Sequence, residues 1–301
     1  MASCRFYTPT LLVVTAALCG AAQAQTAPPA PDMGKFLATG GVSELEGAGG
    51  GGLTPWALIT GYGTRDSYGA NLHYTNVKTQ DYTLGTYGVA VGIGDRVEVS
   101  FAKQTFTGHL TPLNQLRLRQ DIIGLKVKVA GDAVYQQDSW LPQIAVGAMY
   151  KSDKDVRGLG ALSVTSVEQL GAKSDNGTDY YVAATKILFE QSLLLNGTLR
   201  ATKANQMGLL GFGGDKHDAY QLMPEVSAAY MISRKWVAGL EYRRKPRNLS
   251  LDNEKSYYDA FVAWFPTKNF SLTAAYAELG DITVFNTTRQ HGLYLSAQVG
   301  F

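Results

Sequence analysis

The sequence predicts an all-β protein, a transmembrane antiparallel up-and-down β-barrel of about 14 strands, with 12 as the alternative count. Three observations predict this fold. Apolar and polar side chains alternate in segments of about ten residues, aromatic residues gather near the ends of those segments, and short turns alternate with long ones. The sheet must close on itself, because backbone hydrogen bonds cannot be left open in lipid.

The first 24 residues are predicted to be a signal peptide that is cleaved after Ala24. Arg5 supplies positive charge, residues 11–18 are almost wholly apolar, and Ala22-Gln23-Ala24 offers small residues at the cleavage site. This apolar stretch falls short of the roughly 18 residues that a membrane-spanning helix needs. The expected organisation is a signal peptide at 1–24, a flexible periplasmic lead-in at 25–34 and an outer-membrane β-barrel at 35–301, with export through the inner membrane to the bacterial outer membrane.

Composition excludes several classes of function. Both cysteines, Cys4 and Cys19, lie in the signal peptide, so the mature protein is expected to have no thiol, disulfide or cysteine-bound metal. Leu18 precedes Cys19, whereas lipid attachment normally follows a small residue, so ordinary cleavage is preferred. With 27 basic and 25 acidic side chains the chain is close to neutral, which gives no case for nucleic acid. No cofactor is indicated.

A glycine-rich run at residues 47–52 precedes the first clear strand. Bare backbone amides can cradle a phosphate, but the Lys-Ser/Thr that closes a phosphate loop is missing and Leu53-Thr54-Pro55 follows instead. A hairpin loop or a turn facing the lumen is the favoured interpretation, because glycine tolerates the dihedral angles of such turns. The functional alternative is a flexible constriction inside the barrel.

Alternation is clearest at the C-terminal end of the chain. Leu293, Leu295, Ala297, Val299 and Phe301 share one face, and small or polar residues occupy the other. The same period of two recurs at residues 270–276, 236–242, 123–129 and 97–101. Water-soluble sandwiches also have two-faced strands, so the period alone does not establish a membrane location.

The positions of the aromatic residues favour a membrane barrel over a water-soluble sandwich. All four tryptophans and several tyrosines lie near predicted strand ends, which are the girdle positions of outer-membrane barrels. These residues are Trp56, Tyr62, Tyr74, Trp140, Tyr150, Tyr230, Trp236, Tyr242, Tyr258 and Trp264.

Turn lengths follow the rhythm of short periplasmic turns and long extracellular loops. Counting hairpins backward from Phe301 gives 13 strands, the first at residues 55–62. Because single-chain bacterial barrels normally have an even number, residues 35–41 are taken as a further strand, which makes 14; a looser assignment of the early strands makes 12.

Charged residues in mid-strand are expected to line the lumen. They are Arg96, Glu98, Lys126, Lys128, Arg200, Glu225, Glu241, Arg243 and Asp259. Rings of charge in a pore select which solutes pass. The alternative is that these side chains pair across strands and fill the interior. The sequence leaves both readings open.

Two loop clusters offer other chemistry. Asp215, His217 and Asp218 could activate water, but no nucleophile stands at a recognisable spacing, so the chain is not expected to be an enzyme. A basic run from Arg243 to Arg247 lies where a strand leaves the membrane, and it could bind lipopolysaccharide phosphates or simply be solvated.

The stretch GGVSELEGAGGGGLTPWALITGYGTRDSYGAN at residues 40–71, with residues 80–82 and GIGDRVE at 92–98, resembles an uncharacterised proteobacterial outer-membrane β-barrel family, a domain of unknown function. The resemblance covers nearly the whole mature chain and implies a barrel in the outer membrane, with no site residues. The chain's end, with Leu295, Ala297, Val299 and Phe301, also resembles the signal read by the outer-membrane assembly machinery.

Three functions follow as hypotheses. The first is a channel or transporter for small solutes, with import of hydrophobic compounds as the variant favoured if an N-terminal plug fills the lumen. The second is a structural barrel with a closed lumen whose loops contact outer-membrane lipid or lipopolysaccharide. The third is an outer-membrane hydrolase.

Overall fold

The computed structural model describes residues 34–40, 42–109, 114–158, 164–252, 254–282 and 288–301. The chain divides into two units, residues 1–33 and residues 34–301, and only the second is described here. The signal peptide, its cleavage after Ala24 and the lead-in fall on residues outside the described ranges. Those assignments therefore stay predictions.

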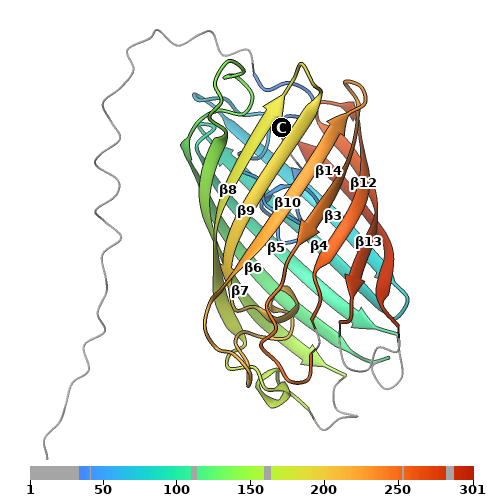
Figure 1. The fold of residues 1–301 in the computed structure, drawn as a ribbon. Coiled ribbons are helices and arrows are strands. Elements are labelled where there is room, and N and C mark those ends of the chain that lie inside the picture. Colours follow the sequence, from blue (N-terminus) through green and yellow to red (C-terminus); the bar gives the residue numbers. More distant parts are fainter. Residues whose placement is uncertain (1–33, 41, 110–113, 159–163, 253, 283–287) are drawn as a thin grey trace, which may run out of the picture. The chain divides into compact units, whose positions relative to one another are not determined.

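Twelve antiparallel strands close into a barrel, in which each strand pairs with its neighbour in sequence and the last pairs with the first (Figure 1). The strands are β3 (Tyr68–Thr79), β4 (Tyr82–Ile93), β5 (Val97–Gly108), β6 (Arg117–Ala130), β7 (Gln143–Arg157), β8 (Asn176–Leu188), β9 (Leu193–Thr202), β10 (Gln221–Met231), β11 (Trp236–Arg243), β12 (Tyr257–Thr267), β13 (Phe270–Gly280) and β14 (Gln290–Gly300). The all-β barrel class is confirmed, at the alternative count of 12 strands.

Three minor features complete the described chain. A two-stranded hairpin of β1 (Val42–Ser43) and β2 (Gly49–Gly50) is separate from the barrel sheet. Two short 3-10 helices, η2 (Glu168–Leu170) and η3 (Asn205–Gly208), lie in loops. In the described part of the chain no helix is both long and apolar enough to cross a membrane.

The outer face of the barrel is apolar, as the alternation predicts. Leu293, Leu295 and Val299 of β14 are exposed, as are Leu72 of β3 and Leu240 of β11. Between them lie small or polar positions that face inward and are buried. A band of exposed aliphatic side chains around a closed sheet is stable only where hydrocarbon covers it.

Aromatic side chains mark both ends of this apolar band. Trp236 and Trp264 stack with ring centroids 5.8 Å apart at one end, and Tyr258 and Tyr276 are exposed near the other. The girdle assignment of Trp56 is wrong, because this residue is 5% exposed and lies inside the barrel. Its indole Nε1 donates a hydrogen bond to Ser227 Oγ at 3.0 Å.

Loop lengths orient the barrel. At the end that carries the C-terminus, the connections at 94–96, 189–192, 232–235 and 268–269 are short, with 131–142 the exception. At the opposite end the connections are long, at 109–116, 158–175, 203–220, 244–256 and 281–289, with 80–81 the exception. By the rule for bacterial barrels, the first is the periplasmic end and the second the outer end.

Candidate functional site

Residues 34–40 and 42–62, called here the internal segment, lead from the exposed Phe36 into the barrel. Every described residue from Val42 to Gly61 is buried. The assignment of residues 35–41 and 55–62 as barrel strands is therefore wrong: among the described residues they pair with none of β3 to β14. The physical reason is that a segment enclosed on all sides buries both of its faces. An extended apolar stretch inside a barrel therefore has a sequence pattern similar to that of a membrane-spanning strand.

Side chains of the barrel wall satisfy the backbone of the internal segment. Glu241 Oε2 accepts hydrogen bonds from the backbone nitrogens of Gly52 and Leu53 at 2.5 and 2.8 Å. Glu98 accepts from the nitrogens of Gly49 and Thr60 at 2.9 and 2.8 Å. Buried backbone groups need such partners, because unpaired ones cost free energy comparable to a lost hydrogen bond. The wall is therefore matched to this segment and holds it in place.

The glycine run makes this close approach possible. A Cβ on Gly51 would lie 2.0 Å from Glu241 Oε1, and one on Gly50 would lie 2.2 Å from the carbonyl oxygen of Thr54. Either contact is impossible without moving backbone or a tightly bound carboxylate. The run is thus a turn facing the lumen, and carboxylates of the wall occupy the amides that a phosphate would need.

Gly51→Ala is expected to loosen the internal segment, because the added methyl displaces Glu241 from the amides of Gly52 and Leu53. The expected cost is about 1–3 kcal/mol, the range for overpacking a filled interior. Gly197→Ala is the matched control, since nothing lies within 4 Å of its ideal Cβ. Urea unfolding in lipid vesicles measures both. Equal stability of the two variants would contradict the close fit at Gly51.

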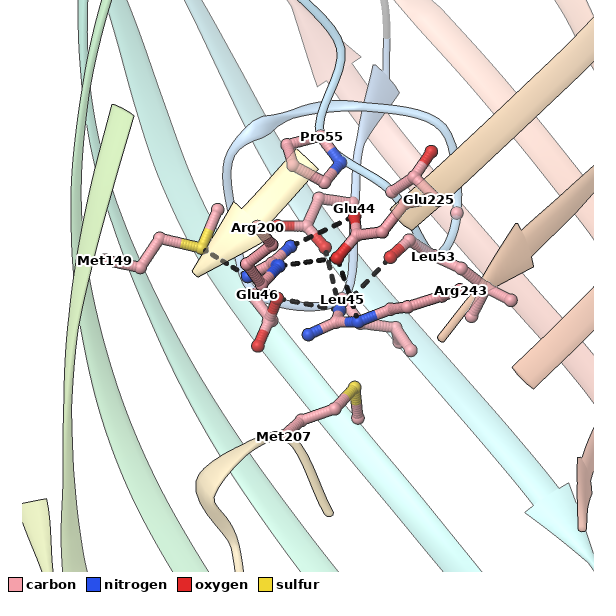
Figure 2. A network of polar contacts seen from close by, with 12 residues as sticks. Glu44, Leu45, Glu46, Leu53, Pro55, Met149, Arg200, Met207, Glu225 and Arg243 are labelled. Carbon is pink, nitrogen blue, oxygen red and sulfur yellow. Dashed lines mark hydrogen bonds and ion pairs between the residues drawn. The ribbon is translucent and has the colours of Figure 1, made fainter. Parts of the chain in front are cut away.

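A network of buried charges lies beside the internal segment (Figure 2). Arg200 Nε donates to Glu225 Oε1 at 2.5 Å, and Arg200 Nη1 lies 3.0 Å from Glu46 Oε2. Arg243 Nη1 reaches Glu46 Oε2 at 2.8 Å and Lys151 also pairs with Glu46. Glu46 comes from the internal segment and the other side chains from the wall, so these pairs join the two.

The nine predicted lumen residues divide by position. Glu98, Lys126, Arg200, Glu225, Glu241, Arg243 and Asp259 are all buried inside the barrel. Lys128 lies toward the periplasmic end and pairs with Asp95 at 2.5 Å and Asp132 at 3.3 Å. Arg96 is exposed in the short connection between β4 and β5, outside the lumen, because the strand has already ended there.

Pairing dominates among the inward residues. Lys126 Nζ lies 3.0 Å from Glu98 and also donates to the carbonyl oxygens of Gly49 and Leu58. Asp259 differs, since neither of its carboxylate oxygens has a hydrogen-bond partner among the described residues. Opposite charges joined to one another and to the internal segment do not present the free rings of an open pore.

Four charged residues of the network were missed from the sequence. Glu44 and Glu46 lie in the internal segment, and Lys151 and Asp179 lie in β7 and β8. Lys151 was missed because β7 extends further than its apolar period suggests. The signal that could have found Lys151 is its place two residues after the inward Met149.

The outer end of the lumen is covered by part of the loop between β9 and β10. Residues 204–214, called here the cap, are all buried. Gln206 is its centre: its Oε1 accepts from Lys245 Nζ and from the Tyr257 hydroxyl, both at 2.7 Å, and its Nε2 donates to Asp252 at 3.0 Å. Burial and the neighbouring Glu254 raise the pKa of Asp252 to about 8.

An apolar cavity of about 30 Å³ lies between the cap and the internal segment. The internal segment contributes Leu45 and Leu53, and the cap contributes Met207, Leu209 and Leu210. The remaining lining is Val77, Leu84, Phe106, Leu116, Leu118, Gln206, Tyr257, Ala277, Leu279, Ile282 and Tyr294. Inner faces of outer-membrane barrels are ordinarily polar. Contact with lipid does not explain the apolar lining of this cavity, because these side chains face the lumen.

A second apolar cavity, of about 40 Å³, lies toward the periplasmic end. Val42 and Trp56 of the internal segment face Leu194, Phe261 and Phe265 of the wall there. Gly51 and Gly52 of the glycine run also line this second cavity, whereas Leu53 lines the first. The lumen thus contains two small apolar cavities, and the internal segment contributes to the lining of both.

The loop cluster considered for hydrolysis has other contacts. Asp215 Oδ1 accepts from the backbone nitrogen of Ser250 at 2.8 Å, and Asp218 pairs with Lys203 at 3.1 Å. His217 is exposed, and within the described ranges no contact joins its ring to a serine. In the same ranges no group of three or more His, Cys, Asp or Glu could hold a metal ion.

These features define a transmembrane β-barrel of the outer-membrane type whose lumen is filled by its own N-terminal segment. The chain belongs to a family described as a protein of unknown function (DUF3034), whose model matches residues 39–298. The resemblance noted in the sequence to an uncharacterised family is thereby confirmed. No curated protein matches the chain.

Solved structures similar to this chain include outer-membrane barrels of different activities. The KdgM porin has a TM-score of 0.47 at 10% identity, over 77% of this chain and 99% of that one. The NanC porin gives 0.47 at 10% identity, over 77% and 97%. Outer membrane phospholipase A from Escherichia coli gives 0.42 at 8% identity, over 80% and 94%. At such values no substrate or activity passes from those proteins to this chain.

Proposed function

We propose that this protein is an outer-membrane transporter for small apolar molecules, held closed by its internal segment. The observation that carries the proposal is the apolar cavity beneath the cap, with Leu45 and Leu53 on one side and Met207, Leu209 and Leu210 on the other. Pockets lined mainly by apolar side chains take apolar ligands. A freely open porin is disfavoured, because most of the inward charges are paired and the internal segment fills the lumen.

The path would run from the cap to the second apolar cavity and then to the periplasmic end. Cap residues Leu209 and Leu210 would move aside for a ligand, since a cavity of about 30 Å³ holds no more than a very small group. The next step would require the glycine run to leave Glu241 and Glu98. Each of these amide-to-carboxylate hydrogen bonds contributes about 1.5–3 kcal/mol, the range for bonds to charged groups, so water must replace them for the segment to move.

Export and assembly of the barrel follow as part of the same proposal. Residues 1–24 would direct the chain through the inner membrane, and the assembly machinery would read Leu295, Ala297, Val299 and Phe301. Leu295, Val299 and Phe301 lie exposed on the outer face of the last strand or just beyond it, where a partner could reach them before the barrel closes.

Uptake of a small aromatic hydrocarbon tests the transport proposal. Cells that carry the barrel are expected to take up radiolabelled toluene faster than cells without it, and Leu84→Trp is expected to abolish the difference by filling the outer cavity. Leu72→Trp is the matched control, because Leu72 is 50% exposed on the lipid face of the neighbouring strand. Equal uptake with and without the barrel would contradict the proposal.

A structural barrel is the second candidate, and the paired charges favour it. Arg200, Arg243 and Lys151 all bind Glu46, as a permanently closed interior would require. The toluene measurement separates the two, because with a structural barrel uptake equals that of cells without the barrel and does not respond to Leu84→Trp.

A further inference from the structure

A polar pocket of about 510 Å³ opens at the outer end of the barrel, next to the end of β11. This volume lies within the range of small-molecule sites. Its lining is His217, Gln221, Met223, Tyr242, Arg244, Lys245, Pro246, Arg247, Glu254 and Ser256. The proposed transport path does not use this pocket.

The pocket forms because β10 extends beyond its partner strand. Pairing of β10 with β11 ends at Glu225 and Arg243, and the backbone nitrogen of Arg244 then donates to Pro224 at 3.1 Å. Pro246 has no N–H with which to continue the ladder. The chain turns inward there, since Lys245 and Asn248 are both buried. The start of β10 is thus left without a neighbour on this side.

The pocket carries unneutralised positive charge. Lys245 Nζ lies 3.2 Å from Glu254, so these two charges offset each other. Arg244 is exposed and forms no ion pair with any of the described residues. Arg247 is also exposed and uses Nε to bind the carbonyl oxygen of Glu254 at 2.7 Å. Two guanidinium groups therefore remain for an anion, and their planar forks suit phosphate.

The position of the pocket relative to the membrane indicates which kind of anion it suits. Tyr242 lies on the outward face of β11, opposite the girdle residue Tyr258, and its hydroxyl is 3.0 Å from Ser256 Oγ. Girdle tyrosines lie at the level of the lipid head groups. The two arginines follow directly beyond this level. A phosphate held there can belong to a molecule whose acyl chains lie against the apolar wall below.

We propose that Arg244 and Arg247 bind the phosphate of a phosphorylated sugar lipid in the outer leaflet. The acyl chains of this lipid would lie against the outward side chains of β10 and β11, where Leu222, Val226 and Leu240 are exposed. The ligand is membrane-anchored, so its binding depends on both the phosphate and the chains. The proposal is independent of what passes through the lumen.

Native mass spectrometry of the full-length barrel in detergent tests this site, with diphosphorylated lipid A as the probe. Arg244→Ala/Arg247→Ala is expected to reduce lipid A binding at least about tenfold, because two charge-assisted hydrogen bonds are lost. Arg244→Ala alone is expected to weaken binding too, and it leaves the Arg247 contact with the loop intact. Arg234→Ala/Lys235→Ala is the matched control at the periplasmic end of the same hairpin, where both side chains are exposed.

Two further probes separate the lipid from other anions. Dephosphorylated lipid A is expected to bind the unaltered barrel as weakly as lipid A binds the double variant. Excess inorganic phosphate is expected to displace lipid A poorly. Equal binding to the double variant and the periplasmic control would overturn the proposal. Efficient displacement by inorganic phosphate would also overturn it, since the pocket would then be a site for soluble anions.

Discussion

Deleting residues 41–60 is expected to turn a silent barrel into one that conducts ions. The deletion removes most of the internal segment and joins positions that already lie together, because the ideal Cβ of Gly40 is 3.1 Å from the carbonyl oxygen of Gly61. The 12 wall strands keep all of their ladder hydrogen bonds, so the barrel remains closed. Single-channel conductance in a planar bilayer measures the result.

Ion preference gives a second readout of the same deletion. Glu44 and Glu46 leave with the segment, and Lys126 loses its contacts with Gly49 and Leu58. The buried wall side chains that remain are four basic (Lys126, Lys151, Arg200 and Arg243) and five acidic (Glu98, Asp179, Glu225, Glu241 and Asp259). The emptied lumen is therefore expected to favour cations, and Lys126→Glu in the shortened chain is expected to strengthen that preference. The unaltered full-length barrel is the silent control. A shortened chain that folds but conducts nothing would contradict the placement of the segment as the closure of the lumen.

Arg200→Ala is expected to cost about 3–5 kcal/mol of unfolding free energy, the range for removing one partner of a buried ion pair. Arg200 is 1% exposed, and it contacts Glu225, Asp179 and Glu46. Its loss leaves three carboxylates near one another in a dry interior. Urea unfolding of the barrel in lipid vesicles, followed by tryptophan fluorescence, measures the change.

Arg157→Ala is the control for this substitution. Arg157 also pairs with a carboxylate, Asp155, but its side chain is 67% exposed. Exposed pairs contribute about 0–1 kcal/mol, so the control is expected to change stability little. If the two variants lost the same amount, the network around Arg200 would not be dry, and the lumen would contain water that screens its charges.

The sequence by itself determined the wall of this barrel. The period of two places Leu293, Leu295 and Val299 on the lipid face and assigns Glu98, Lys126 and Glu241 to the interior. This inference works because side chains alternate strictly between the two faces of a strand, and a one-residue slip would move every apolar side chain from the lipid face to the lumen. Turn lengths likewise separate the two ends, with the exceptions at 80–81 and 131–142.

Only the tertiary structure decided what fills the barrel. Residues 55–62 have the composition of a strand, yet they lie inside, because enclosure on all sides removes the need for one polar face. Gly52 and Glu241 are 189 positions apart in the chain, and their hydrogen bond exists only once the barrel has closed around the segment. A period of two reveals which side chains point inward. It does not reveal which residues they contact there, because those contacts are made across the lumen by residues remote in sequence.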